Sequence, residues 1–157
     1  MTVTNADKIE LDAVPEGGQR PDSGEKSVKL VVVALILRGR EVLICQRRPD
    51  QPMALKWEFP GGKMEPGETA EEALARELDE ELGIDAKIGT RITRMRHTYR
   101  SGSSVDLQFF AVHEFGGEIT NRIFNDLRWC DLIDLPSYDF LAADRNLVRD
   151  LAAGKLL

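Results

Sequence analysis

Apolar and polar positions follow patterns that divide the first third of the chain into strands and loops. Residues 28–37 are apolar at almost every position and rich in β-branched side chains, which predicts a strand buried on both faces. Residues 41–47 alternate in polarity, so we expect them to form a hairpin with the first strand. A loop at residues 48–56 then leads to a short strand at residues 57–59.

Residues 70–82 follow a helical period instead. An apolar stripe that can pack on a sheet is formed by leucines at every fourth position, namely Leu74, Leu78 and Leu82. Thr69, with Glu72 three residues later, is a capping-box signature for the start of this helix. Gly83 is the residue expected in left-handed conformation at its end.

The second half of the chain repeats this order. We expect strands at residues 105–115 and 127–132, a loop at residues 119–125 between them, and a C-terminal helix at residues 141–151. The succession of strands, helix, strands and helix indicates an α+β fold in which a mixed sheet lies between helices.

The N-terminal segment differs from the rest. Residues 1–27 are polar and punctuated by proline and glycine, which predicts a flexible segment in which residues 9–11 could add an edge strand. The 157-residue chain is long enough for one domain, and we assign that domain to residues 28–157.

Composition narrows the possible partners. The net charge of −6 argues against binding of duplex nucleic acid, which needs a basic face. No apolar run approaches the ~20 residues of a membrane-spanning helix, and no secretory signal is visible, so we expect a cytoplasmic protein. Cys45 and Cys130 lie in apolar runs and are expected to be buried, reduced thiols. His97 and His113 are too few and too far apart to indicate zinc.

The acidic face of the predicted helix is the first candidate for chemistry. Glu77, Glu80 and Glu81 share an arc of roughly 100° on an α-helix, where like charges repel. Such a face is tolerated either at a solvated surface or where cations neutralise it. Oxygen-only ligands of high charge density suit Mg²⁺ or Mn²⁺.

The surroundings of these glutamates favour the second interpretation, because they resemble the Nudix box of the Nudix hydrolases. Every specified position is present, in the order Gly62, five residues, Glu68, seven residues, Arg76-Glu77-Leu78, one residue, Glu80-Glu81, one residue, Gly83-Ile84. The resemblance extends from about residue 28 to the C-terminus and is strongest to MutT-like members. It implies an α/β/α sandwich and Mg²⁺- or Mn²⁺-dependent hydrolysis of nucleoside triphosphates to the monophosphate and pyrophosphate.

The resemblance also implies roles for the residues of the box. Glu77 and Glu81 would be direct metal ligands, and Glu80 would bind metal or position its water. Glu68 would lie near the metal or orient Arg76, whose planar fork can hold a carboxylate by two bonds. The backbone of Gly61 and Gly62 would complete the cradle for phosphate, with a carbonyl of Gly61 as a possible metal ligand.

One position departs from the MutT-like pattern. Such enzymes often place a further acidic residue before the penultimate strand, and that position falls near Ile123 here. We therefore expect a helix carboxylate, Glu80 or Glu77, to activate water through the metal, with Arg76 completing the catalytic set.

A nucleoside pocket is expected beside the box. Arg47 and Arg48 end the second strand, where MutT-like enzymes place an arginine near the phosphate or base. Asp144 matches a position that reads the edge of the base, although it could equally be a helix N-cap. Trp57 and Phe140 could stack on the base or belong to the core.

Three functions remain open from the sequence. The favoured one is pyrophosphohydrolysis of oxidised purine nucleotides such as 8-oxo-dGTP, or of CTP and dCTP. A nucleotide-sugar or dinucleotide pyrophosphatase is the second, and a catalytically silent nucleotide-binding module is the third. The partner in each is a small nucleotide, and either a monomer or a homodimer fits.

Overall fold

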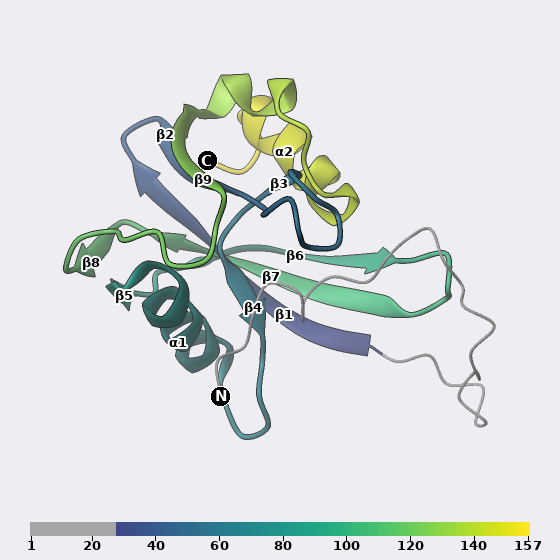
Figure 1. Cartoon of the computed structure of the whole chain (residues 1–157), viewed down its shortest axis with the longest axis horizontal. Helices are drawn as coiled ribbons and strands as arrows, with labels where there is room; N and C mark the ends of the chain where they lie inside the picture. The colour runs from purple at the N-terminus through teal and green to yellow at the C-terminus, as the bar shows by residue number, and fades with distance from the viewer. Residues whose placement is uncertain (1–27) are drawn as a thin grey trace.

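The computed structural model describes residues 28–157, so the predictions for residues 1–27 lie outside the described residues. Within them, a seven-stranded mixed sheet has the order β3-β2-β1-β7-β6, with β4 added beside β1 and β9 beside β2 (Figure 1). The elements are β1 (Val28–Arg38), β2 (Glu41–Gln46), β3 (Trp57–Glu58), β4 (Gly61–Lys63), α1 (Ala70–Leu82), β5 (Asp85–Lys87), β6 (Arg91–Thr98), β7 (Ser104–Val112), β8 (Glu114–Gly116), β9 (Asp126–Asp131), the 3₁₀ helices η2 (Leu132–Ser137) and η3 (Ala142–Asp144), and α2 (Arg145–Ala152).

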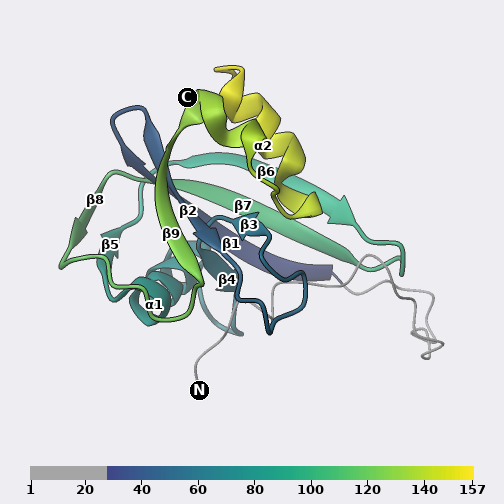
Figure 2. The ribbon, with the colours of Figure 1, turned by 45° about the horizontal axis from the view of Figure 1, so that its top comes forward.

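Strand β1 is the centre of the sheet, and its two faces supply two separate cores. Val32, Ala34 and Ile36 face α1 and pack with its leucines. Val31 and Val33 face the other way, toward the apolar side of α2. The helices therefore cover opposite faces of the sheet (Figures 1 and 2), which confirms the predicted sandwich. This arrangement follows from the unbroken apolar run of β1, since only a strand covered on both sides can bury both sets.

The predicted hairpin is confirmed: β1 and β2 pair antiparallel next to the turn at Gly39, whose φ is +61°. The sequence predicted no strand at residues 61–63, where the structure has β4. Gly62 pairs with Val32 and Gly61 with Val33, about 30 residues earlier in the chain. No local pattern announces this pairing, since glycine is usually unfavourable in strands.

Two further predictions needed adjustment, and one element had not been predicted. The strand expected at residues 105–115 is two strands, because β7 ends at Val112 and β8 then pairs with β5. The helix expected at residues 141–151 begins as the 3₁₀ helix η3 and becomes α-helical only at Arg145. The 3₁₀ helix η2 had not been expected, and Asp131 caps it by accepting a hydrogen bond from the Ile133 amide at 3.1 Å.

Both cysteines are buried and neither is part of a disulfide, as expected for residues 45 and 130. Burial raises the pKa of the Cys130 thiol to about 11. No helix within residues 28–157 is long and apolar enough to cross a bilayer.

Helix α1 spans the predicted residues 70–82. The side chain of Thr69 accepts from the Glu72 amide at 3.1 Å, and the Glu72 carboxylate accepts from the Thr69 amide at 2.9 Å, so the capping box is complete. Gly83 ends the helix at φ +69° and donates its amide to the Asp79 carbonyl.

Removing this cap should weaken the whole domain, because α1 carries one of its two cores. We expect Thr69→Ala to lower the free energy of unfolding by about 1 kcal/mol, as measured by urea denaturation. Thr69→Ser is the matched control and should stay close to wild type. Equal stability of all three proteins would contradict a role for the cap.

Candidate active site

Helix α1 turns two acidic side chains toward the sheet. Glu77 and Glu81 are separated by four residues, so they lie one above the other on the inner face of the helix. Both are fully buried, whereas the side chain of Glu80 keeps 21% of its surface exposed. Of the three glutamates that were predicted to share one side of the helix, two therefore lie in the core and one lies at its edge.

The glycines of β4 lie directly against these carboxylates. The amide of Gly61 donates to Glu81 Oε1 at 3.3 Å. A Cβ atom placed on Gly62 would lie 1.8 Å from Glu77 Oε2, and one on Gly61 would lie 2.1 Å from the Val32 carbonyl oxygen. A side chain at residue 61 would clash with the backbone of β1, and a side chain at residue 62 would displace the Glu77 carboxylate. Gly61 therefore allows β4 to lie close to β1, and Gly62 allows Glu77 to lie close to β4.

Arg76 is the main cation of this region. It holds Glu68 by two hydrogen bonds, from Nε to Oε2 at 2.6 Å and from Nη2 to Oε1 at 2.9 Å. Its Nη1 atom lies 3.5–3.7 Å from three more carboxylates, those of Glu65, Glu77 and Glu80. The hydrogen bonds from Arg76 lower the pKa of Glu68, and the same bonds raise the pKa of Arg76.

The donor set in this region suits a hard divalent cation. Glu77, Glu80 and Glu81 offer only oxygen atoms, which Mg²⁺ and Mn²⁺ prefer. Buried carboxylates are costly unless cations compensate them, and the single charge of Arg76 is shared among four glutamates. No three His, Cys, Asp or Glu side chains within residues 28–157 already converge as a finished ligand set.

Arg47, which the sequence places in the substrate pocket, is fully buried and held by protein groups. It donates from Nη1 to Glu58 Oε2 at 3.2 Å and from Nε to the Pro52 carbonyl at 2.9 Å. Glu58 is also fully buried, and sequence analysis gave it no role. No local pattern in the sequence indicates this pair, because Glu58 comes close to Arg47 only through the pairing of β2 with β3. Arg48 instead lies at the surface beside Asp50, at 3.3 Å.

The remaining predicted substrate residues lie on the α2 side of the sheet. Phe140 stacks on Phe59, with ring centroids 5.2 Å apart, and Trp57 meets the Tyr138 ring edge-on at 5.2 Å. Trp57 and Phe140 belong to the core that α2 covers. Asp144 is buried at the N-cap position of α2, but its side chain makes no capping hydrogen bond. The short segment from Phe59 to Gly62 links these residues to the carboxylates.

The loop before β9 is fixed to the end of α1. Arg122 donates from Nη1 to the Asp79 carbonyl at 2.8 Å, and the Thr120 amide donates to the Leu82 carbonyl at 2.8 Å. Ile123 packs among the apolar residues near α1, at the position where an acid had been sought. Sequence analysis missed this contact because Arg122 is 43 residues from Asp79, so no local pattern indicates it.

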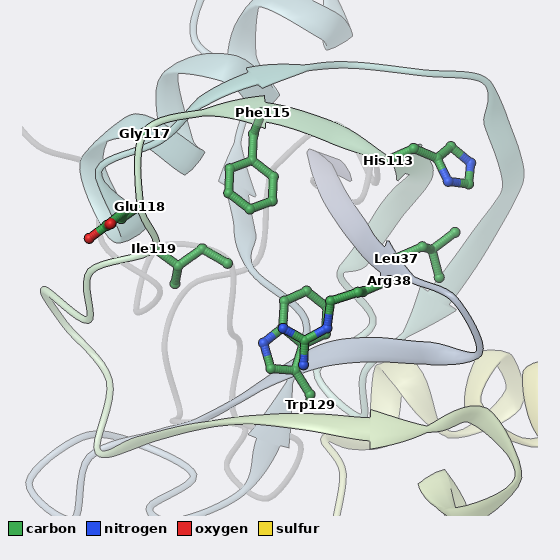
Figure 3. A pocket seen from close by; sticks show the side chains of 8 residues that line it. All are labelled: Leu37, Arg38, His113, Phe115, Gly117, Glu118, Ile119 and Trp129. Carbon is green, nitrogen blue, oxygen red and sulfur yellow. The ribbon is translucent and has the colours of Figure 1, made fainter.

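A surface cavity of about 440 Å³ lies at the far end of β1, near β8 and β9. Figure 3 shows Phe115 and Ile119 pointing toward Trp129, and the Arg38 guanidinium lies 4.0 Å from the centre of that indole ring. None of the predicted site residues lines this cavity. The carboxylates and glycines on α1 and β4 therefore remain the best candidate for catalysis.

Comparison with known proteins gives the same assignment. Residues 28–151 match the family model of the NUDIX domain. A Mycobacterium tuberculosis protein named "Putative 8-oxo-dGTP diphosphatase 2" is 39% identical over 127 residues, which cover 79% of this chain and 88% of that protein. The CTP pyrophosphohydrolase of Escherichia coli K12 is 36% identical over 123 residues, which cover 78% and 90% of the two chains.

The fold agrees with solved structures as well. The solution structure of the E. coli ORF135 protein superposes with a TM-score of 0.73 at 34% identity, covering 82% of this chain and 91% of that one. Together with the complete box and the placement of its glutamates against β4, these matches show that the chain belongs to the Nudix hydrolase family.

Proposed function

We propose that this protein hydrolyses nucleoside triphosphates to the monophosphate and pyrophosphate with the help of Mg²⁺ or Mn²⁺. The observation that carries the proposal is the pair of buried carboxylates, Glu77 and Glu81, packed against the two glycines of β4. The names of the relatives support 8-oxo-dGTP or CTP and dCTP as the first substrates to try.

Glu77 and Glu81 are the residues that would hold the cation, joined by Glu80, with Glu68 nearby and the Gly61 carbonyl as a further oxygen. A bound divalent ion supplies charge neutralisation for the phosphates and a more acidic water. The chain itself contributes the position of each carboxylate. Gly62 leaves room for the Glu77 carboxylate, and the Gly61 amide donates to Glu81 Oε1 at 3.3 Å, so both side chains lie close to the glycine backbone that we assign to the phosphates.

Arg76 acts in this proposal as a positioning residue. Its bidentate contact fixes Glu68, and its Nη1 atom faces Glu77 and Glu80. It thereby orients these three carboxylates and limits the repulsion among them.

Glu80 is the carboxylate we assign to proton transfer. It is the most exposed of the three helix glutamates, so a water molecule can reach its carboxylate and transfer a proton to it. The loop before β9 offers no carboxylate at residue 123, so the base must come from elsewhere.

The first prediction concerns turnover itself. With Mg²⁺ and a panel of 8-oxo-dGTP, CTP, dCTP, canonical nucleotides and nucleotide sugars, we expect phosphate release from a triphosphate only when pyrophosphatase is added. Glu77→Gln and Glu81→Gln should each lower kcat by about 10²-fold or more, the scale of losing a group that stabilises the transition state. Asp79→Asn, on the exposed face of the same helix, is the matched control. No turnover by wild type on any substrate would favour a silent binding module.

The second prediction separates proton transfer from metal binding. We expect Glu80→Gln to reduce kcat by about 10²- to 10⁴-fold, the usual contribution of general acid–base catalysis, while Mn²⁺ affinity measured by calorimetry changes less. Near-wild-type kcat for this variant would remove Glu80 from the role.

The third prediction concerns pH. Because Arg76 lowers the pKa of Glu68 below its ordinary value of 4.5, the ionised pair stabilises the fold above that pH and loses its effect as pH falls through the lower folded pKa. Urea unfolding should show wild type more stable than Glu68→Gln by about 1–2 kcal/mol at pH 7, with the gap shrinking below pH ~4.5. Glu71→Gln, an exposed change on the same helix, should show no such dependence. A gap that stays constant with pH would contradict the assignment.

A further inference from the structure

The surface cavity at the far end of β1 lies apart from the candidate active site. Two of its lining residues, Leu37 and Arg38, are the last two residues of β1. Gly62 of the candidate site pairs with Val32, on the same strand. The step from Val32 to Arg38 is a distance of about 20 Å along an extended strand. The cavity is therefore separate from the catalytic carboxylates and glycines.

The lining of this cavity has the composition of a small-molecule site. Its volume of about 440 Å³ falls within the roughly 300–1,000 Å³ of ligand pockets. Phe115, Ile119 and Trp129 supply apolar surface, and Figure 3 shows the first two pointing toward the third. Arg38 and His113 add nitrogen donors to the same lining. Aromatic and apolar walls with a few polar groups are typical of sites that bind small ligands.

The wall that contains Phe115 is held at both ends by the rest of the fold. Strand β8 pairs with β5, which places Phe115 opposite Ala86. Beyond the turn at Gly117, the Thr120 amide donates to the Leu82 carbonyl at 2.8 Å. The lining segment between these two anchors is short, so the cavity is preformed. A ligand would therefore lose little affinity to the ordering of this wall.

Arg38 is placed to bind an anion in this cavity. Its guanidinium lies over the Trp129 ring, with Cζ 4.0 Å from the ring centre. Nη2 donates to Glu41 Oε1 at 3.3 Å, but both side chains are exposed, so this contact is weak. A guanidinium has five N–H donors in one plane. Contact with the indole through its face and with Glu41 through one nitrogen leaves donors at its edge for a phosphate or carboxylate.

The charges around the cavity favour an anionic ligand over a cationic one. Figure 3 shows the Glu118 carboxylate turned away from Trp129, whereas the Arg38 guanidinium lies against that indole. His113 can donate a hydrogen bond from one ring nitrogen even when it is neutral. The class of ligand that fits this lining is therefore a flat aromatic ring that carries an anionic group.

We propose that this cavity is a second ligand site, which binds a nucleoside monophosphate with its base at Phe115, Ile119 and Trp129 and its phosphate at Arg38. Such a nucleotide has both the flat ring and the anion that the lining selects. The proposed reaction releases one, so this choice of ligand rests on the proposed function. Binding here needs no divalent cation, because Arg38 supplies the positive charge.

The two tryptophans of the chain allow this site to be observed directly. Trp129 lines the cavity, whereas Trp57 belongs to the core on the α2 side of the sheet. Each gives one indole N–H signal in a ¹H–¹⁵N correlation spectrum, and Trp129→Phe identifies which is which. With EDTA present, CMP or GMP should shift the Trp129 signal saturably. The matching nucleoside and inorganic phosphate should each bind about ten-fold more weakly or worse, because each lacks one set of contacts.

The decisive variant is Arg38→Gln, which removes the charge that the phosphate needs at an exposed position. We expect it to weaken the binding of CMP or GMP at Trp129 by about ten-fold or more, the scale of one charge-assisted hydrogen bond. Arg40→Gln is the matched control. It removes an exposed arginine from the same β1–β2 turn but outside the cavity lining, and it should leave the affinity unchanged.

The outcomes separate this site from the hydrolase. A nucleotide-induced shift confined to Trp57, equal affinity in Arg38→Gln and wild type, or a nucleoside that binds as tightly as its monophosphate would each overturn the second site. The titrations use neither metal nor turnover. Binding at Trp129 without hydrolysis of any triphosphate would therefore contradict only the proposed function, and hydrolysis without binding at Trp129 would contradict only the second site.

Discussion

The contact between α1 and β4 is the constraint on which the rest of the site depends. Two carboxylates with no solvent access face a strand that makes room for Glu77 because it lacks a side chain at residue 62, and that donates the Gly61 amide to Glu81. A helix face carrying Glu77 and Glu81 would otherwise have to turn toward water, since burying charge without compensation is costly. The leucines at every fourth position of α1 pack in the core and hold that face inward. The same helical turns therefore carry both the apolar packing and the two buried glutamates.

Electrostatics explains why one arginine has so many neighbours. Arg76 contacts four glutamates, two of them on its own helix, and is itself mostly buried. One positive charge cannot balance four negative ones, so the region is left with an excess that favours a cation. Under the proposed function, divalent ions bound at this excess would reverse the local charge, which would let an acidic protein attract a polyphosphate.

The sequence predicted local features well and non-local ones poorly. The bounds of α1 are correct because Thr69, Glu72 and Gly83 specify both ends within a few residues. The Nudix box could also be identified from the sequence, since all of its residues lie in one continuous stretch, from Gly62 to Ile84. Strand β4 was missed because it depends on pairing with β1. The burial of Arg47 was missed because Glu58 becomes its neighbour only through the register of β2 and β3. The sequence could not tell whether Trp57 and Phe140 stack on a base or belong to the core, because this depends on packing. The structure buries both side chains.

The most direct test of the account is to locate the cation. Crystals soaked in Mn²⁺ and measured near the manganese absorption edge should show an anomalous peak between Glu77 and Glu81, close to the Gly61 carbonyl, with Glu80 moved away from Arg76. The peak should vanish in Glu81→Gln crystals soaked in the same way. A fully soaked wild-type crystal with no peak at these residues, or with manganese only at unrelated surface carboxylates, would contradict the central claim that the buried acids of α1 form a metal site.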